Sequence, residues 1–357
     1  MENKVILTAT GDVFPANLSY HRGKGIISNF NKHNGVPWQE SFLKIFANSD
    51  IGLINLEAPI LPNSEFKDSM TFAGNDNIIS FLKNCGINVI NIANNHILEY
   101  GPEGFNNTIN ILQNNGLNII GRYQNTIYDY YKNNMKISIA AFNDIHDIYN
   151  PKLYQDYNRE AILNCINKMG NADCKILVFH WGNEYINIPS YKQIENAKEF
   201  IDAGADIIIG HHPHVIQPVM EYKQGIICYS LGNFIFDMIY KNNVRIGMVI
   251  QFIIIKGKKP KYEIKGIYIK DDYTPSLIDI NIFNNIYKKY EKMFYIFLGL
   301  SKNDYEKKYK FILKKNRLIQ RIIMKKDLIN NINNISMKDV NNIINSKLNK
   351  FNKIKYI

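Results

Sequence analysis

The sequence predicts an α/β fold, and three observations carry this prediction. Short apolar runs rich in β-branched residues alternate with segments of helical spacing along most of the chain. Apolar residues make up 46% of the 357 residues and charged residues 21%, a balance typical of a globular protein with a buried core. Polar and ionisable residues gather where the apolar runs stop. Because ligand sites in α/β sheets lie beyond the carboxyl ends of the strands, a functional site is expected at these positions.

The first 120 residues predict a regular alternation of strands and helices. Apolar runs indicate strands, which are expected at residues 5–9, 50–56, 87–93 and 117–120. Apolar residues at helical spacing indicate helices, which are expected at residues 38–47, 76–84 and 102–114. Asn75 or Asp76 can cap the second of these helices, and Pro102 can open the third. Residues 17–37 are polar and contain glycine, so we expect an ordered loop or flap there.

The same alternation continues to about residue 270. Further strands are expected at residues 136–142, 175–179, 205–209 and 226–229, and further helices at residues 160–168 and 191–202. In the last of these helices Ile194, Ala197 and Ile201 share one face, which indicates a helix that packs against a core. Residues 245–256 and 262–270 alternate like a terminal antiparallel hairpin.

The composition of the chain changes near residue 276. Residues 280–357 contain 18 Lys and Arg against 5 Asp and Glu, whereas the first 279 residues contain 25 against 27. The net charge of +11 therefore belongs to the C-terminal segment and says little about the candidate site. We predict two units, an α/β domain at residues 1–275 and a basic helical extension at residues 276–357. Apolar residues of the extension, such as Phe294 and Phe297, are expected to pack on the core or on a partner.

Composition also bears on compartment and on partners. The four cysteines show no CxxC spacing and lie in or beside apolar segments, which predicts buried free thiols; they are Cys85, Cys165, Cys174 and Cys228. The N-terminus enters a strand directly, without the features of a signal peptide, and no apolar window is long enough for a transmembrane segment. We expect a cytoplasmic protein, or one that is peripheral at the inner face of the membrane. The basic tail lacks a nucleic-acid-binding motif, so nucleic acid is not an expected partner.

Histidines mark the strongest candidate site. Three of the eight histidines fall within four residues, directly after the apolar run at residues 205–209, and two others follow other strands. They are His211, His212 and His214, together with His96 and His180. Neutral imidazole keeps a lone pair, so histidine is well suited to bind a transition metal at neutral pH. A histidine can also occupy a surface turn without chemical purpose, but turn residues do not account for histidine at three strand ends. The pattern predicts a metal site.

The polar residues at these strand ends form one set of candidate ligands. Carboxylate, amide and imidazole groups together suit Mn, Fe, Zn or Mg, and the absence of thiolate argues against a structural zinc site. A carboxylate can bridge two ions, and a two-metal centre activates water and stabilises a phosphoryl oxyanion. His96 would then be free to act as a general acid. The candidates are Asp12, Glu57, Asn95, His96, His180, His212 and His214.

Six ordered motifs at the strand ends can be compared with known families. They are Gly11-Asp12, Asn55-Leu56-Glu57, Asn94-Asn95-His96 with Tyr100-Gly101, His180-Trp181-Gly182 with Glu184-Tyr185, Gly204-Ala205-Asp206 through His212-Pro213-His214, and Ser230-Leu231-Gly232-Asn233-Phe234. Together they resemble the CapA family of capsule and poly-γ-glutamate synthesis proteins over roughly residues 4–270. The resemblance implies a calcineurin-like metallophosphatase fold, which is a two-sheet αββα sandwich. It also implies one or two divalent ions beside His96, bound by Asp12, Glu57, Asn95, His180, His212 and His214.

Three departures from the family pattern bear on the site. Phe14 stands where metallophosphatases usually have the histidine of an Asp-x-His pair, so one metal position lacks a ligand. Glu99 stands where the family commonly has aspartate, and we assign it a catalytic role in orienting the ring of His96. Phe72-Ala73 replaces a common Phe-Arg pair, which removes an anion contact. His211 lies at a variable position and is left out of the ligand set.

Two functions of different classes follow from the sequence. The leading hypothesis is a metal-dependent hydrolase or transferase that acts on a phosphate ester or an activated acyl group during synthesis of a capsule or a poly-γ-glutamate-type polymer. Its substrate would be a polyanionic polymer or a phosphorylated small molecule, and its C-terminal extension could bind partner proteins of capsule synthesis. The alternative is a non-catalytic accessory protein that binds a polyanionic cell-surface polymer or its precursor. The absence of histidine at Phe14 favours this alternative.

Overall fold

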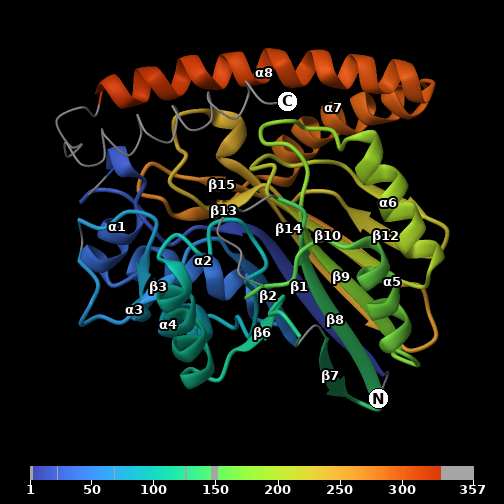
Figure 1. The fold of residues 1–357 in the computed structure, drawn as a ribbon, viewed down its shortest axis with the longest axis horizontal. Helices are drawn as coiled ribbons and strands as arrows, with labels where there is room; N and C mark the ends of the chain where they lie inside the picture. Colours follow the sequence, from blue (N-terminus) through green and yellow to red (C-terminus); the bar gives the residue numbers. More distant parts are fainter. Residues whose placement is uncertain (1–2, 22, 68, 125–126, 146–151, 331–357) are drawn as a thin grey trace.

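Two main β-sheets pack face to face in the computed structural model, which describes residues 3–21, 23–67, 69–124, 127–145 and 152–330 (Figure 1). The strands of the first sheet are β1 (Lys4–Val13), β2 (Ile51–Leu56), β5 (Val89–Asn91), β6 (Asn118–Ile120), β13 (Asn233–Ile235), β14 (Ile246–Ile255), β15 (Lys261–Ile269) and β16 (Pro275–Leu277). Their order is β16-β15-β14-β1-β2-β5-β6, and β13 pairs with β1.

The second sheet has the order β11-β12-β10-β9-β8-β7. Its strands are β7 (Tyr128–Lys132), β8 (Met135–Asn143), β9 (Cys174–His180), β10 (Ile207–His211), β11 (Val219–Tyr222) and β12 (Gly225–Cys228). A separate short pair is formed by β3 (Ile60–Leu61) and β4 (Gly74–Asn75).

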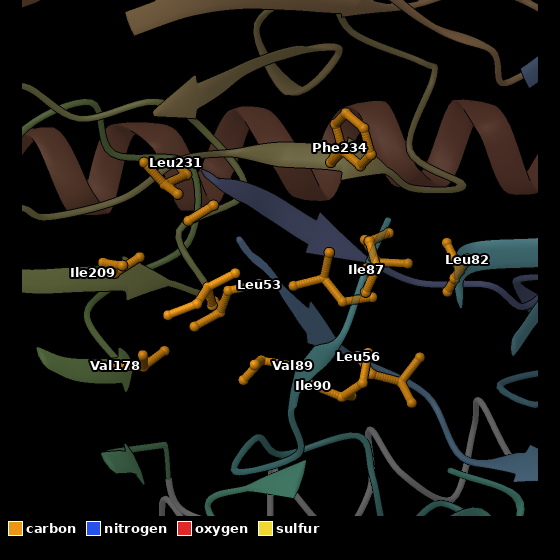
Figure 2. Close-up of a cluster of buried hydrophobic side chains, with 14 of the residues drawn as sticks. Leu53, Leu56, Leu82, Ile87, Val89, Ile90, Val178, Ile209, Leu231 and Phe234 are labelled. Atoms are coloured by element: carbon orange, nitrogen blue, oxygen red, sulfur yellow. The ribbon is translucent and has the colours of Figure 1, made fainter. Parts of the chain in front are cut away.

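One hydrophobic core fills the space between the two sheets. Apolar side chains from alternate positions of both sheets belong to a single buried cluster. Figure 2 shows Leu53 and Val89 of the first sheet in this cluster together with Val178 and Ile209 of the second. Because every strand must keep its apolar side chains in this layer, the register of each strand is fixed, and the positions of the strand ends are fixed with it.

Helices cover the outer face of each sheet. The helices packed with the first sheet are α1 (Ile26–His33), α2 (Val36–Phe46), α3 (Asp76–Asn84) and α4 (Gly101–Asn114). The second sheet is covered by α5 (Arg159–Lys168) and α6 (Tyr191–Asp202), and by the C-terminal helices α7 (Ile280–Leu298) and α8 (Lys302–Asn330), of which α7 also contacts β15 of the first sheet. Short 3₁₀ turns occur at η1 (Ser19–His21) and η2 (Asn242–Val244). The predicted two-sheet αββα sandwich with a C-terminal helical extension is confirmed. Residues 331–357 of the predicted extension lie outside the described residues.

The segment predicted as a loop at residues 17–37 contains the helix α1. Its sequence is rich in Asn and Gly, which have low helix propensity, so local preference does not indicate a helix there. Ile26, Ile27 and Phe30 are nevertheless buried in the main core. Burial of this apolar face, rather than local propensity, stabilises the helix.

The strands that carry the predicted site residues run parallel within each sheet. In the first sheet β1, β2 and β5 are parallel neighbours, and in the second sheet β8, β9, β10 and β12 are. Their carboxyl ends therefore meet at one end of the sandwich, where open α/β sheets place their ligand sites. The four cysteines are buried and free, as predicted. None of the described helices combines the length and the apolarity that a membrane span requires.

Candidate metal centre

Both sheets contribute side chains to one polar cluster at this end of the sandwich. Those that end or follow strands of the first sheet are Asp12, Glu57, Asn95 and His96, and those from the second sheet are His180, His212 and His214. The ring centroids of His180 and His212 lie 4.8 Å apart, and those of His212 and His214 lie 5.7 Å apart. The structure therefore brings together all six residues that were predicted as ligands.

Asp12 is fully buried and is held by four donors. Its Oδ1 accepts a hydrogen bond from Asn55 Nδ2 at 2.8 Å and lies 3.1 Å from His211 Nδ1. Its Oδ2 accepts a hydrogen bond from the backbone N–H of His212 at 3.2 Å and lies 3.3 Å from His214 Nδ1. Burial alone would raise the pKa of Asp12, but the two histidine side chains hold this pKa well below its ordinary value. Asp12 is therefore a carboxylate at neutral pH.

Glu57 is the unsatisfied group of the cluster. Its side chain is fully buried, and neither carboxylate oxygen has a hydrogen-bond partner among the described residues. The ring nitrogens near its Oε1 are His180 Nε2 at 3.5 Å, His214 Nε2 at 3.9 Å and His96 Nε2 at 4.0 Å. Burial, reinforced by the charge of Asp12, raises the pKa of Glu57 well above its ordinary value. A buried carboxylate without donors is unfavourable unless a proton or a cation neutralises it.

The three histidines of the predicted ligand set that are buried divide into two kinds. Burial lowers the pKa of His212 to about 4, and burial together with His212 lowers the pKa of His180 well below its ordinary value. Burial also acts to lower the pKa of His214, but Glu57 and a second carboxylate outweigh it and raise this pKa to about 9. His180 and His212 are therefore neutral at neutral pH, with lone pairs available. His214 carries a proton that a bound cation would displace.

The donor set fits a divalent metal ion. Two groups of three ligand atoms, with all atoms of a group within 4.8 Å of one another, share Glu57; they are Glu57, His212 and His214, and Asp12, Glu57 and His180. Asn95 Oδ1 lies 2.8 Å from His180 Nε2, at the edge of the second group. The unpaired oxygens of Glu57 and the unpaired Nδ1 of His212 are the buried atoms that such an ion would satisfy. Imidazole and carboxylate donors suit the predicted metals Mn, Fe, Zn and Mg.

His96 stands at the exposed edge of the cluster. Its side chain is 23% exposed, whereas that of Glu57 is fully buried. His96 Nδ1 lies 2.8 Å from Glu99 Oε1, and the ring centroids of His96 and Phe72 lie 5.6 Å apart. The carboxylate and the aromatic ring hold the imidazole so that its Nε2 faces the cluster. A group that arrives from solvent would therefore meet this nitrogen before it reached Glu57.

Phe14 gives one side of the cluster an aromatic wall. Its ring is fully buried, stacks on Phe236 at 4.7 Å and lies edge-on to Phe72 at 5.4 Å. Phe236 in turn contacts the ring of His214, with centroids 4.6 Å apart. At the position where an Asp-x-His pair would add an imidazole, this chain has an apolar aromatic group. Fewer ligands are consequently available on the Asp12 side than on the His180 side.

A network of asparagine side chains beneath the cluster was not predicted from the sequence. Asn55 Oδ1 accepts hydrogen bonds from Asn91 Nδ2 at 2.9 Å and from Asn94 Nδ2 at 3.2 Å, which orients its Nδ2 toward Asp12. All three asparagines are buried. Two of them occur in the motifs at the ends of β2 and β5, but only the pairing of β1 with β2 and of β2 with β5 shows that they form a chain.

Two other residues outside the predicted ligand set contact ligands. His211 is fully buried and directs its Nδ1 toward Asp12, so it holds a candidate ligand rather than serving as one. Asn233 Oδ1 lies 3.0 Å from His214 Nδ1, and its Nδ2 donates to the backbone carbonyl of Val244 at 2.9 Å. In the sequence, only its position next to the predicted ligand His212 could have indicated that His211 belongs to the site.

The backbone that carries two of the histidines is strained. His212 has φ 93° and His214 has φ 57°, values in the left-handed region that residues other than glycine rarely adopt. Such conformations cost about 1–3 kcal/mol each and persist only where surrounding contacts impose them. One such contact is the hydrogen bond from the backbone N–H of Tyr185 to the carbonyl of Pro213, at 2.8 Å, between the two histidines.

A family model matches the part of the chain that contains this cluster. The model described as bacterial capsule synthesis protein PGA_cap matches residues 6–238, which is more than half of the chain. The chain belongs to this family. The matched region of this capsule synthesis family member contains every predicted site residue, and it ends before the C-terminal helices α7 and α8.

Two curated relatives support the same family. The capsule biosynthesis protein CapA of Bacillus anthracis is 34% identical over 255 residues, which cover 66% of this chain and 60% of that protein. The PGA biosynthesis protein CapA of Bacillus subtilis (strain 168) is 31% identical over 242 residues, covering 64% of this chain and 63% of that protein. The chain thus spans about three fifths of the length of these relatives.

Likeness to solved structures is weaker. A hypothetical protein from Thermus thermophilus aligns with a TM-score of 0.48 at 10% identity, over 73% of this chain and 98% of that chain.

Proposed function

We propose that this capsule synthesis family member is a metal-dependent hydrolase or transferase that acts on a phosphate ester or an activated acyl group. The observation that carries the proposal is the buried carboxylate of Glu57, which has no hydrogen-bond donor among the described residues and faces three histidine rings. A buried carboxylate of this kind destabilises the folded state unless a cation binds beside it. The relatives named for capsule and PGA biosynthesis support a place in the assembly of a capsule or poly-γ-glutamate-type polymer.

In this proposal one or two divalent ions, of Mn, Fe, Zn or Mg, bind at the cluster. The residues that would hold them are Asp12, Glu57, Asn95, His180, His212 and His214. When bound, such an ion polarises a phosphoryl or carbonyl oxygen and lowers the pKa of a water molecule. Asn55 and His211 would keep Asp12 ionised and oriented, since both contact its Oδ1.

His96 is the proposed general acid. Its Nε2 faces the cluster from the exposed edge, and Glu99 orients the ring through Nδ1. In the proposed step a water molecule, or the acceptor group in a transfer, bonds to the phosphorus or acyl carbon. The bond from that atom to the leaving-group oxygen breaks, and the Nε2–H proton passes to this oxygen. The Glu99 carboxylate lies 2.8 Å from Nδ1 and so fixes the orientation of the imidazole ring. The substrate would be a polyanionic polymer or a phosphorylated small molecule.

One observation favours a second candidate function, that of a non-catalytic accessory protein that binds a polyanionic cell-surface polymer or its precursor. Phe14, Phe72 and Phe236 form an aromatic cluster where an additional imidazole ligand would stand. A site with fewer ligands can bind an ion and an anionic group without turnover. Partner proteins of capsule synthesis that bind the C-terminal extension are compatible with either candidate.

Metal analysis and an activity panel distinguish the two candidates. Purified full-length protein is analysed for Mn, Fe, Zn and Mg, and is then assayed on phosphate monoesters, phosphate diesters and an acyl phosphate with each metal added. The hydrolase proposal expects bound metal and turnover that is lost after chelation and restored by one metal. Bound metal without turnover on any substrate would favour the accessory protein. The absence of metal binding under all conditions would contradict the metal centre itself.

A further inference from the structure

The C-terminal helix α8 contacts the loop at residues 183–189, which borders the metal centre. Asn183 Nδ2 donates a hydrogen bond to the hydroxyl of Tyr309 at 3.1 Å, and Arg317 Nη2 donates to Asn183 Oδ1 at 3.4 Å. Further along α8 from Tyr309, Asn316 Nδ2 donates to the backbone carbonyl of Tyr185 at 2.9 Å. Three side chains of a helix outside the family match thus hold neighbouring parts of one loop.

The start of α8 is itself fixed on the second sheet. The hydroxyl of Tyr305 donates to the backbone carbonyl of Pro189 at 2.6 Å, and the Tyr305 ring lies edge-on to Tyr191 at 5.3 Å. Tyr305 and Tyr309 are buried in the cluster that covers the outer face of this sheet. Figure 1 shows α8 as a long helix that lies across one edge of the molecule, beside α7 and near α6. The start of α8 is therefore anchored on the second sheet, beside the loop.

The loop is connected to the candidate ligands through the backbone. The N–H of Tyr185 donates to the carbonyl of Pro213, which lies between His212 and His214. Both histidines have left-handed backbone conformations that need outside contacts to persist. In addition, Gln217 Nε2 donates to two backbone carbonyls of the same loop, at 2.8 Å and 3.1 Å. Two sets of hydrogen bonds thus tie the histidine segment to the loop that α8 supports.

We propose that α8 is a positioning element of the metal centre and that Tyr309 and Asn316 are its positioning residues. They hold the loop at residues 183–189, and the loop holds the segment with His212 and His214 in the conformation that directs both rings toward Glu57. The inference rests on the proposed function, because it assigns α8 a role at a metal site. It extends that function to a helix outside the region matched by the family model.

The test is cobalt binding by single-site variants of the full-length protein. Tyr309→Phe removes only the hydroxyl that accepts from Asn183, and Asn316→Ala removes the donor to Tyr185. Phe311→Ala is the matched control, because Phe311 is on the same helix and is 69% exposed. We expect each positioning variant to bind Co²⁺ about twofold to tenfold more weakly than the wild type and to shift its visible absorption bands. Phe311→Ala should match the wild type in Co²⁺ affinity and in its visible spectrum. The melting temperatures of all three variants should stay close to that of the wild type.

Additivity gives a second measurement. Asn183→Ala combined with Tyr309→Phe should weaken Co²⁺ binding no more than Asn183→Ala alone, since Asn183→Ala already removes the donor to the Tyr309 hydroxyl. If the wild type binds Co²⁺ and the positioning variants match Phe311→Ala in affinity and spectrum, α8 does not position the ligands. If the wild type binds neither Co²⁺ nor any other divalent ion, the proposed metal function fails, and this inference fails with it. Should Asn316→Ala not fold, Tyr309→Phe decides, because the ring that packs in the core is kept.

Discussion

At the scale of single residues, the different surroundings of His96 and His212 predict different effects of mutation. His212→Ala should lose both metal and activity, because it removes a buried neutral imidazole from the ligand set. His96→Ala should keep metal and lose activity by about 10²–10⁴-fold, as expected for the loss of a general acid. Metal content and turnover measured on the same preparations check both statements. If His96→Ala lost metal as completely as His212→Ala, His96 would be a ligand.

The depressed pKa of His212 predicts how the metal-free protein responds to acid. Its pKa is about 4 in the folded state, whereas the ordinary value is 6.5. Below about pH 6.5, His212 is therefore protonated in the unfolded chain and still neutral in the folded protein. Stability is therefore lost as the pH falls from about 7 to about 5, by on the order of 2 kcal/mol from this residue. The raised pKa of Glu57 acts in the opposite direction, so the comparison needs a variant.

His212→Gln removes the titration of that side chain. In chelator-treated protein, urea unfolding at the two pH values should show a smaller loss of stability on acidification for the variant than for the wild type. The same loss in both proteins would mean that His212 is not desolvated in the folded state.

The candidate ligands could be predicted from the sequence because imidazole and carboxylate groups are unusual directly after buried strands. The residues that hold them could not. Asn55 and His211 contact Asp12 only because β1 pairs with β2 in the first sheet and also contacts β10 of the second, and a motif does not contain that topology. Phe14 stacks on Phe236, which is distant in sequence. The sequence shows phenylalanine instead of histidine at position 14, but it does not show which side chains surround that ring.

At the scale of elements, helices and strands were predicted correctly where apolar residues recur with a clear period. They were missed where packing against the rest of the fold, rather than local sequence, stabilises the element. The helix α3 has the predicted bounds, whereas α1 lies in a segment that was predicted as a loop or flap because it is polar and contains glycine. The strand β7 was also not predicted. It lies at the edge of the second sheet, is partly exposed, and has the sequence Tyr-Asp-Tyr-Tyr-Lys, which lacks the apolar run of a central strand.

The pairing of β10 with its neighbours predicts that Gly210 cannot be replaced. A Cβ atom at Gly210 would lie 2.0 Å from the backbone oxygen of Tyr229 and 2.6 Å from Nε1 of Trp181. Gly210→Ala must therefore push apart the strands that place the histidines, and we expect a destabilisation of more than about 3 kcal/mol or the loss of folded protein. Gly299→Ala is the control, since its Cβ would meet atoms only at 3.6 Å or more. Thermal unfolding of both variants checks the prediction, and equal melting temperatures would contradict it.

At the scale of the whole molecule, composition predicted an uneven distribution of charge, and the structure shows where the basic segment packs. The helices α7 and α8 contribute Phe294, Phe297, Tyr305 and Tyr309 to the cluster on the outer face of the second sheet. Their lysines could be counted from the sequence, but the surface that these aromatic residues cover could not be identified. The division into residues 1–275 and residues 276–357 stays a prediction, because contact between two units does not decide whether one of them folds alone.

Removal of the extension tests that division. A fragment of residues 1–279 should fold cooperatively, because nearly all of the core between the two sheets lies within it. It should melt at a lower temperature than the full chain, since it loses the burial of Phe294 and Phe297, at about 1.5–3 kcal/mol for each fully buried phenylalanine. It should also expose the ring of Tyr229, which packs on Phe294, and so bind a hydrophobic dye.

A fragment of residues 1–330 is the control, because it keeps α7 and α8. Residues 1–279 should melt at a lower temperature than this fragment and should bind Co²⁺ more weakly than either single variant of α8. Calorimetry, dye fluorescence and Co²⁺ titration of the three proteins supply the measurements. Residues 1–279 without a cooperative transition would show that the extension completes the core of one domain. Unchanged Co²⁺ affinity in that fragment would show that the loop at residues 183–189 keeps its conformation without α8.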